Sequence, residues 1–127
     1  MDFKKNILIT GEAGFTPWNN GNMEEFYYIY ILQSEKDGKT YTGYTSNLPL
    51  RFEAHQAGEV PSTKHRRPLK LIYFEGCLNQ ADAVKREKYL KINYGKLFLG
   101  NLLKAYFTIQ LEHINKERKL WITRKTS

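Results

Sequence analysis

Cysteine is almost absent from this sequence. Cys77 is the only cysteine in 127 residues, so no intrachain disulfide can form. A chain without disulfides suits a reducing compartment, and we expect a cytoplasmic protein. The three histidines, His55, His65 and His113, are widely separated and have no second cysteine to join them. This scarcity of ligands argues against a structural zinc site.

Long apolar runs are absent as well. No stretch of the sequence approaches the roughly 20 apolar residues of a membrane-spanning helix, so we expect no membrane partner. The apolar patch from Ile7 to Ile9 is too short for the core of a signal peptide. Residues 14–22 are rich in glycine, proline and asparagine, which is typical of a loop. We therefore expect residues 1–23 to be a disordered leader outside the domain, with Met23 as an alternative start.

Positive charge is what the chain has in excess. Its formal charge is +7, from 20 basic and 13 acidic side chains. Residues 24–107 carry 13 basic and 9 acidic side chains, and residues 108–127 carry 5 and 2. Such a balance attracts polyanions such as DNA, RNA or anionic membrane, although a merely soluble basic surface would look the same. We expect residues 108–127 to be a basic C-terminal tail that is frayed from residue 112 onward.

Apolar patterning predicts a domain over residues 24–107. Strands are expected at residues 26–32, 40–45 and 69–75, and helices at 47–57 and 79–92, with a third helix over 96–111 that could run into a strand. Asn47 is placed to cap the first helix and Gly58 to end it. This order, with a single hairpin, predicts a single α+β domain in which helices pack on an antiparallel sheet.

Two tyrosines are expected to share one face of the hairpin. If Asp37 and Gly38 form a two-residue turn, paired residue numbers sum to 75, and Tyr30 and Tyr41 point the same way. Gly43 would leave an opening in that face. A bulged turn would change this register. The alternative interpretation is an aromatic core, which is common in β-rich domains.

A carboxylate interrupts the apolar face of the second helix. Ala83, Val84, Glu87 and Leu90 share one side by helical spacing, and that side should meet the sheet. A buried carboxylate without a partner is costly. Either Glu87 forms a structural ion pair with a basic residue such as Arg51, or it holds a hard cation such as Mg²⁺.

Arg51 and His55 lie four residues apart on the first helix, so they point the same way. Arginine offers a rigid fork for phosphate, and histidine can donate or shuttle a proton. A solvated polar face is the simpler alternative. Together with the tyrosines and the carboxylate, however, these residues suit the in-line attack of water on a phosphodiester.

With these residues in this order, the sequence resembles a known family. Tyr28-Ile29-Tyr30 is similar to the first half of the GIY-YIG signature, and Tyr41-Thr42-Gly43 is similar to the second half. The gap of 11 residues between Tyr30 and Tyr41, and of 10 more to Arg51, also fits the family. The positions of His55 and Glu87 match as well. The resemblance covers about residues 25–100 and is greatest to small stand-alone GIY-YIG proteins that are similar to an excinuclease nuclease domain.

The resemblance implies a three-stranded antiparallel sheet flanked by helices, and hydrolysis with one metal ion and no covalent enzyme intermediate. Tyr41 would be the general base, and Tyr30 would orient the attacking water. Arg51 would stabilise the charge on the phosphate. Glu87 would bind Mg²⁺ or Mn²⁺, which would stabilise the leaving oxygen. His55 would hydrogen-bond the nucleophile or share the role of the base.

Further positions follow from the same resemblance. Lys64, Arg66 and Arg67, in the basic loop after the first helix, are expected to hold nucleic acid. Either Asn93 or Asn101 could complete the active site. The expected function is that of a metal-dependent endonuclease, with DNA as the favoured substrate and structure rather than sequence directing the cut, in DNA repair or processing. The alternatives are a nucleic-acid-binding module that cuts poorly, and an interaction protein in which the tyrosines and Glu87 belong to the core.

Overall fold

The computed structural model describes residues 18–19, 22–23 and 25–126. The predicted leader over residues 1–23 therefore falls mostly outside the described residues. Within it, strand β1 (Trp18–Asn19) pairs antiparallel with strand β2 (Asn22–Met23). The chain divides into two units, residues 1–88 and 89–127, and each is described by itself.

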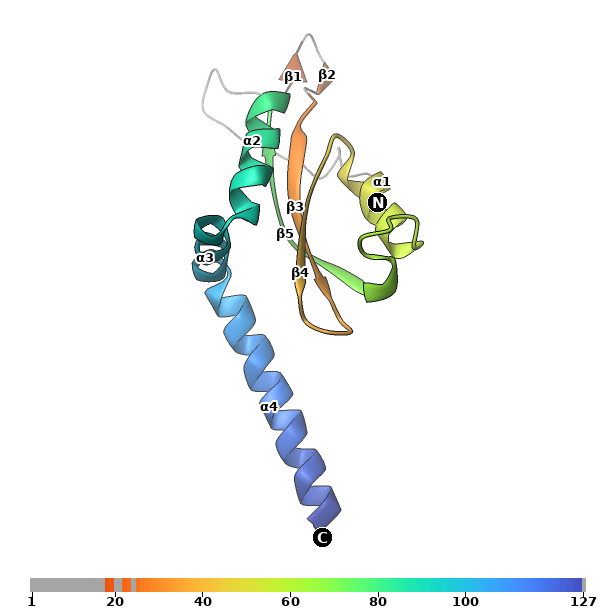
Figure 1. The fold of residues 1–127 in the computed structure, drawn as a ribbon, viewed down its shortest axis with the longest axis vertical. Helices are drawn as coiled ribbons and strands as arrows, with labels where there is room; N and C mark the ends of the chain where they lie inside the picture. The colour runs from red at the N-terminus through yellow and green to blue at the C-terminus, as the bar shows by residue number, and fades with distance from the viewer. Residues whose placement is uncertain (1–17, 20–21, 24, 127) are drawn as a thin grey trace. The chain divides into compact units, whose positions relative to one another are not determined.

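The first unit is built on a three-stranded antiparallel sheet (Figure 1). Strand β3 (Tyr27–Ser34) lies in the centre, between β4 (Thr40–Thr45) and β5 (Leu69–Cys77). From Ile29 to Ser34 every residue of β3 is buried, which explains why this strand is a dense run of β-branched and aromatic residues. The predicted fold class, a three-stranded antiparallel sheet flanked by helices, is confirmed.

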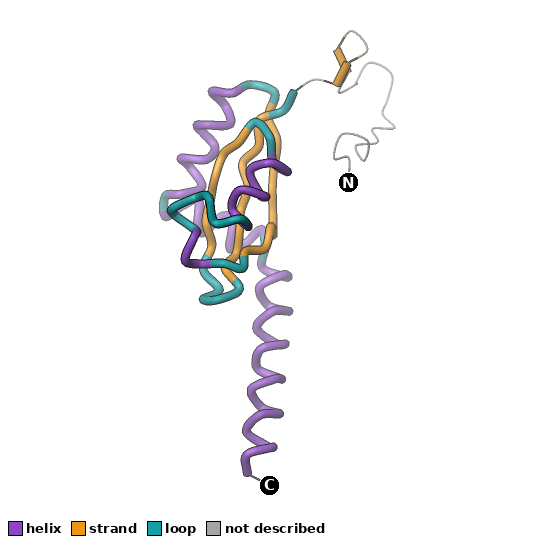
Figure 2. Tube along the Cα trace, turned by 90° about the vertical axis from the view of Figure 1, so that its right-hand side faces the viewer, coloured by secondary structure: helices purple, strands orange, loops and turns teal. Residues whose placement is uncertain are grey.

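Two helices flank this sheet on opposite faces (Figures 1 and 2). Helix α1 (Leu48–Gln56) begins where the side chain of Asn47 accepts a hydrogen bond from the Leu50 amide at 3.1 Å, as predicted. The other helix is α2 (Gln80–Lys91). A short 3₁₀ turn, η2 (Lys64–Arg66), lies in the loop between α1 and β5. Gly58 has a φ of 78°, so it provides the left-handed residue after α1.

The second unit contains helices α3 (Asn93–Leu102) and α4 (Lys104–Thr126). The prediction of one helix over residues 96–111 is therefore wrong, because the helix is interrupted at Leu103, between α3 and α4. The prediction of a frayed segment from residue 112 is also wrong. Residues 104–126 contain no glycine or proline and many strong helix formers, and the basic last turn suits the helix dipole. None of the described helices is both long and apolar enough to cross a membrane.

The hairpin register differs from the prediction by two residues. Tyr30 pairs with Gly43, and Leu32 pairs with Tyr41, so paired numbers sum to 73. The turn holds four residues, not two, because the Ser34 amide donates to the Lys39 carbonyl at 2.9 Å and the Gly38 amide to the Ser34 carbonyl at 2.8 Å. An even shift leaves each side chain on its face. Tyr30 and Tyr41 therefore still share one face, as predicted.

That face of the sheet carries a hydrophobic cluster. Its buried members are Tyr30, Leu32, Leu48 and Leu69, and its partly buried members are Tyr28, Tyr41, Phe52 and Leu71. Leu48 and Phe52 come from α1, so this cluster joins the helix to the sheet. Packing of α1 onto the tyrosine face is what brings its polar residues to the tyrosines.

Candidate active site

The ring of Tyr30 lies directly over Gly43 on the neighbouring strand. A Cβ atom placed on Gly43 would overlap both Cζ and Oη of Tyr30, which no packed side chain tolerates. The opening that the sequence predicted at Gly43 is thus filled by the phenol of Tyr30. Glycine is required here because the ring approaches the backbone so closely.

A chain of polar contacts runs through the phenol of Tyr30. Its Oη lies 2.8 Å from Nε2 of His55, and it accepts a hydrogen bond from Nε of Arg51 at 3.4 Å. On the other side of the imidazole, Nδ1 of His55 lies 2.7 Å from Oγ1 of Thr63. Tyr30 is 1% exposed, and His55 and Thr63 are fully buried. This series of polar contacts therefore leads from the buried Thr63 to the partly exposed Arg51.

Tyr41 lies beside this chain and is only partly buried. Its ring centroid is 5.2 Å from that of His55 and 6.3 Å from that of Tyr30, with tilted or edge-on geometry. The three rings form one aromatic group with Tyr41 at its accessible side. The structure thus brings together the predicted catalytic residues Tyr30, Tyr41, Arg51 and His55.

Burial and the charge of Arg51 set the protonation of this group. Burial, helped by the nearby guanidinium, lowers the pKa of His55 from 6.5 to about 4, so the imidazole is neutral at neutral pH. Burial also raises the pKa of Tyr30, against the lowering effect of its hydrogen bond from Arg51. That hydrogen bond in turn raises the pKa of Arg51, which stays charged.

Glu87 lies on α2 and is half-buried. On the same face Ala83 is fully buried and Leu90 is 1% exposed, as the helical spacing predicted. The carboxylate of Glu87 is near enough for its charge to contribute to the raised pKa of Tyr30. Arg51 donates from its Nε to Tyr30. The two alternatives for Glu87, a structural ion pair and a bound cation, stay predictions.

An open cleft of about 650 Å³ is lined by residues of helix α1 and of the segments that flank it. Its lining residues are Thr45, Ser46, Asn47, Leu50, Arg51, Glu53, Ala54, Ala57 and Glu59. Arg51 thus has one side on the buried phenol of Tyr30 and another on a cleft that solvent reaches. An arginine in this position can meet a phosphate from outside without losing its inner partner.

Comparison with known proteins identifies the fold. The family model of the GIY-YIG catalytic domain matches residues 26–101. The chain belongs to the GIY-YIG family. A UPF0213 protein of Clostridium perfringens is 37% identical over 94 residues, which cover 73% of this chain and 96% of that protein.

Shorter matches point the same way. A UPF0213 protein of Pediococcus pentosaceus is 46% identical over 66 residues, or 51% of this chain and 68% of that protein. Another, from Staphylococcus haemolyticus, is 41% identical over 66 residues, or 51% of this chain and 79% of that protein. No solved structure matches the chain.

A GIY-YIG domain implies a divalent metal ion, so the question is which side chains of this protein could bind one. Within the described residues, no group of three or more histidine, cysteine, aspartate or glutamate side chains could hold an ion alone. Mg²⁺, however, keeps several waters and is commonly bound by one or two carboxylates together with substrate phosphates. Glu87, a half-buried carboxylate whose charge acts on Tyr30, fits this one-carboxylate mode.

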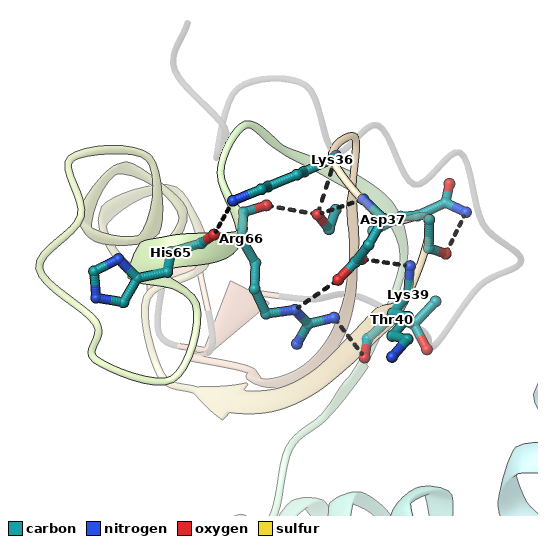
Figure 3. A network of polar contacts seen from close by, with 9 residues as sticks. Lys36, Asp37, Lys39, Thr40, His65 and Arg66 are labelled. Atoms are coloured by element: carbon teal, nitrogen blue, oxygen red, sulfur yellow. Dashed lines mark hydrogen bonds and ion pairs between the residues drawn. The ribbon is translucent and has the colours of Figure 1, made fainter.

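The basic loop is held against the β3–β4 hairpin (Figure 3). Arg66 donates to the Thr40 carbonyl at 3.4 Å and approaches the Asp37 carboxylate at 3.9 Å. The Ser34 hydroxyl donates to the Arg66 carbonyl at 2.6 Å, and Lys36 to the His65 carbonyl at 3.4 Å. Arg66 therefore helps to hold the basic loop against the hairpin.

The other two residues of the predicted nucleic-acid-binding set differ from each other. Arg67 donates to the carbonyls of Lys64 and Gln56 at 2.9 and 3.2 Å, and its guanidinium occupies the space beside Gly58. The side chain of Lys64 is exposed. Lys64 is thus the member of the set whose charge is most open to a phosphate.

Three further residues show how far the sequence could define the site. Asn93 and Asn101, the candidates for completing it, are both exposed and belong to α3, in the second unit. Thr63 was missed by sequence reasoning, although it is fully buried against His55. A threonine in a polar loop, between Ser62 and Lys64, gives no signal by itself, since only the fold shows that it is buried.

The arrangement can support hydrolysis of a phosphodiester. Arg51 can bind and stabilise the phosphate, and Tyr41 and Tyr30 present hydroxyl groups beside a neutral imidazole. General acid–base catalysis by such groups contributes about 10²- to 10⁴-fold. Tyr30 and His55 thus form the buried part of the site, and Tyr41 and Arg51 form its partly exposed part.

Gly43→Ala is expected to lower the free energy of unfolding by about 1–3 kcal/mol, because the new Cβ would displace the Tyr30 ring. Thermal unfolding measures this change. Gly100→Ala in α3 is the matched control. A Cβ there meets nothing within 4 Å, so alanine should leave stability unchanged or raise it. Equal stability of the two variants would contradict the close approach of Tyr30 to Gly43.

Protonation of His55 is expected to make the fold acid-sensitive. Below pH 6.5 an unfolded chain protonates this histidine, whereas the folded chain does so only near pH 4. The free energy of unfolding should therefore fall as pH falls from 6.5 to 4, by up to roughly 3 kcal/mol. Denaturant titrations at several pH values measure this.

Comparison of wild type with a His55 variant shows how much of the pH dependence of stability comes from His55. His55→Gln should lose this part of the pH dependence, while His113→Gln, which changes an exposed histidine on α4, should keep it. If wild type and His55→Gln lost stability in parallel between pH 6.5 and 4, His55 would not be the group that titrates.

Proposed function

We propose that this protein is a metal-dependent endonuclease that hydrolyses phosphodiester bonds of nucleic acid, with DNA as the favoured substrate. The observation that carries the proposal is the position of Arg51. Its guanidinium donates to Tyr30 within the buried GIY-YIG framework and also lines an open cleft. A phosphate that enters the cleft would therefore meet the arginine whose Nε holds Tyr30.

The two tyrosines receive different roles because they differ in burial. Tyr41 is partly exposed, so we assign it the role of general base that activates water. Tyr30 is buried with a raised pKa, which makes it the weaker candidate for that role. We assign Tyr30 to hold and orient the water, and His55 to support Tyr30. Arg51 would stabilise the negative charge that develops on the phosphate.

Glu87 is the residue that we propose as the metal ligand. Bound Mg²⁺ or Mn²⁺ would stabilise the leaving oxygen. The half-buried carboxylate suits this role, since partial burial strengthens its attraction for a cation while one side stays accessible.

The wider assignment rests on charge and composition. The net charge of +7 favours a polyanion as substrate. We propose that residues 24–107 form the nuclease domain and that the basic tail, residues 108–127, adds affinity without sequence preference. Cutting would then be directed by DNA structure, as in repair or processing. The single cysteine favours a cytoplasmic location.

A second candidate function is a nucleic-acid-binding module that keeps the fold but cuts poorly. One observation favours it: the described residues contain no preformed cluster of metal ligands. Metal binding would then depend on Glu87 and on oxygens of the substrate.

Glu87→Ala is expected to reduce Mg²⁺-dependent cleavage at least about 100-fold, because it would remove the proposed metal ligand. Branched, single-stranded and supercoiled DNA should be compared, with and without Mg²⁺ or Mn²⁺. Glu112→Gln, which changes an exposed carboxylate on α4, is the control and should cut like wild type. Binding and melting temperature of Glu87→Ala should stay close to those of wild type.

The outcomes separate the candidates. If wild type binds these substrates but cuts none of them with either metal, the binding module replaces the nuclease. If wild type also fails to bind at low salt, the protein is an interaction protein with an aromatic core.

Lys64→Ala is expected to weaken DNA binding across sequences and to reduce the salt slope of the binding constant by about 1, since one phosphate contact would be lost. Its side chain is exposed, so the fold should not suffer. Lys64→Arg keeps the charge and is the control. Arg66→Ala and Arg67→Ala would be poor substitutes, because both side chains also hold the loop. An unchanged salt slope in Lys64→Ala would exclude this contact.

A further inference from the structure

Two segments that are far apart in the sequence lie side by side (Figure 3): the hairpin turn, residues 35–40, and the basic loop, residues 64–67. Their basic side chains are Lys36, Lys39, Lys64, Arg66 and Arg67, and their acidic ones are Glu35 and Asp37. These ten residues thus hold +3 of the net charge of +7. The fold brings like charges together here, which costs free energy unless an anion is bound.

Hydrogen bonds hold the hairpin turn and the basic loop together. The hydroxyl of Ser34, which is 1% exposed, donates to the Arg66 carbonyl at 2.6 Å and accepts from the amides of Lys36 and Asp37 at 3.1 and 3.3 Å. A hydroxyl has one proton and two acceptor sites, so all three are used. Lys36 also donates from Nζ to the His65 carbonyl at 3.4 Å (Figure 3). The fold therefore sets the arrangement of the charges before any ligand arrives.

The lysines of this surface differ from its arginines. The side chains of Lys36, Lys39 and Lys64 are exposed. Arg66 contacts the hairpin turn, and Arg67 donates to carbonyls in the loop and at the end of α1. The arginines thus support the surface, while the lysines present the charge that is most open to a ligand.

The basic loop adjoins the open cleft. The Arg67 guanidinium occupies the space beside Gly58, and the residues on either side of this glycine, Ala57 and Glu59, line the cleft. Arg51 lines the same cleft. A nucleic-acid backbone with one phosphate at Arg51 therefore has further phosphates available for the loop.

We propose that the hairpin turn and the basic loop form one surface that binds backbone phosphates of nucleic acid beside the cleft, through Lys36, Lys39 and Lys64. Lys36 and Lys39 have no part in the proposed catalysis. The choice of nucleic acid as the polyanion rests on the proposed function, whereas the surface rests on its own charges and contacts. Neither segment carries a large apolar side chain, which binding at an anionic membrane would use.

Lys36→Ala and Lys39→Ala are each expected to reduce the salt slope of DNA binding by about 1, since each would remove one phosphate contact. Lys36→Ala combined with Lys64→Ala should reduce it by about 2. Fluorescence anisotropy of a labelled DNA duplex with the full chain, at several salt concentrations and in EDTA to prevent cutting, measures the slope. Alanine keeps the backbone amides that hold the turn, so the fold should not change.

Lys85→Ala is the matched control, because it removes one exposed positive charge from α2 in the same unit. This variant should keep the wild-type slope, and so should Lys36→Arg and Lys39→Arg, which keep the charge. An unchanged slope in Lys36→Ala or in Lys39→Ala would overturn the proposal. An equal loss in Lys85→Ala would also overturn it, because net charge alone would then account for binding.

Asp37→Asn changes the charge of the surface in the opposite direction. The Asp37 carboxylate lies 3.9 Å from Nε of Arg66 and accepts from the Lys39 amide at 2.9 Å. Asparagine keeps an acceptor for this amide but removes the negative charge, so DNA binding at low salt should tighten about two- to fivefold. Misfolding would not tighten binding, so a gain supports the surface, and an unchanged or weaker affinity contradicts it.

The outcomes separate this surface from the nuclease function. If wild type binds DNA through these lysines but cuts nothing with Mg²⁺, the nuclease function fails and the surface stands. If wild type cuts DNA while the lysine variants bind like wild type, the surface fails and the nuclease stands. Vesicles of phosphatidylcholine and phosphatidylserine are the second probe. Tighter binding to these vesicles than to the duplex, with the same dependence on Lys36 and Lys39, would overturn the proposal, as would no binding of the duplex at low salt.

Discussion

The hydrogen bond between Tyr30 and His55 is the contact on which the rest of the site depends. It joins the central strand to helix α1 across 25 residues of sequence, and both side chains are buried. A polar pair in such surroundings is stable only if each polar atom is matched. Thr63 matches the inner side of the imidazole, and Arg51 matches the outer side of the phenol. Hydrophobic packing brings α1 to the sheet, and these polar contacts fix the position of the helix on it.

The site separates neutral groups from charged ones. His55 and Tyr30 are uncharged and buried, whereas Arg51 lines the open cleft and Glu87 is half-buried. A charged imidazole beside Arg51 would be opposed both by burial and by repulsion. With His55 neutral, Arg51 is the positively charged member of this group that an outside phosphate would meet.

The sequence predicted the elements of the domain, because alternation and capping are local signals. It placed Asn47 as a cap, Ala83 and Leu90 on a buried face, and Tyr30 with Tyr41 on one face. It missed the four-residue turn, since Asp37-Gly38 is equally compatible with two-residue and longer turns. It missed helix α4 because a polar, basic stretch resembles a tail. The sequence did not predict the contact of Thr63 with His55, because this contact depends on how the loop after α1 folds.

The pairing of Tyr30 with Gly43 has a consequence for folding fidelity. If the hairpin slipped by one or two residues, Thr42, Tyr44, Tyr41 or Thr45 would stand opposite Tyr30 in place of glycine. Each of these carries a Cβ where the phenol ring must lie, so a hairpin misaligned by one or two residues would exclude the ring. The contact between Tyr30 and Gly43, in the middle of the strands, thus favours the correct register of β3 and β4. The turn between the strands does not have to determine this register, so its length can change without misaligning β3 and β4.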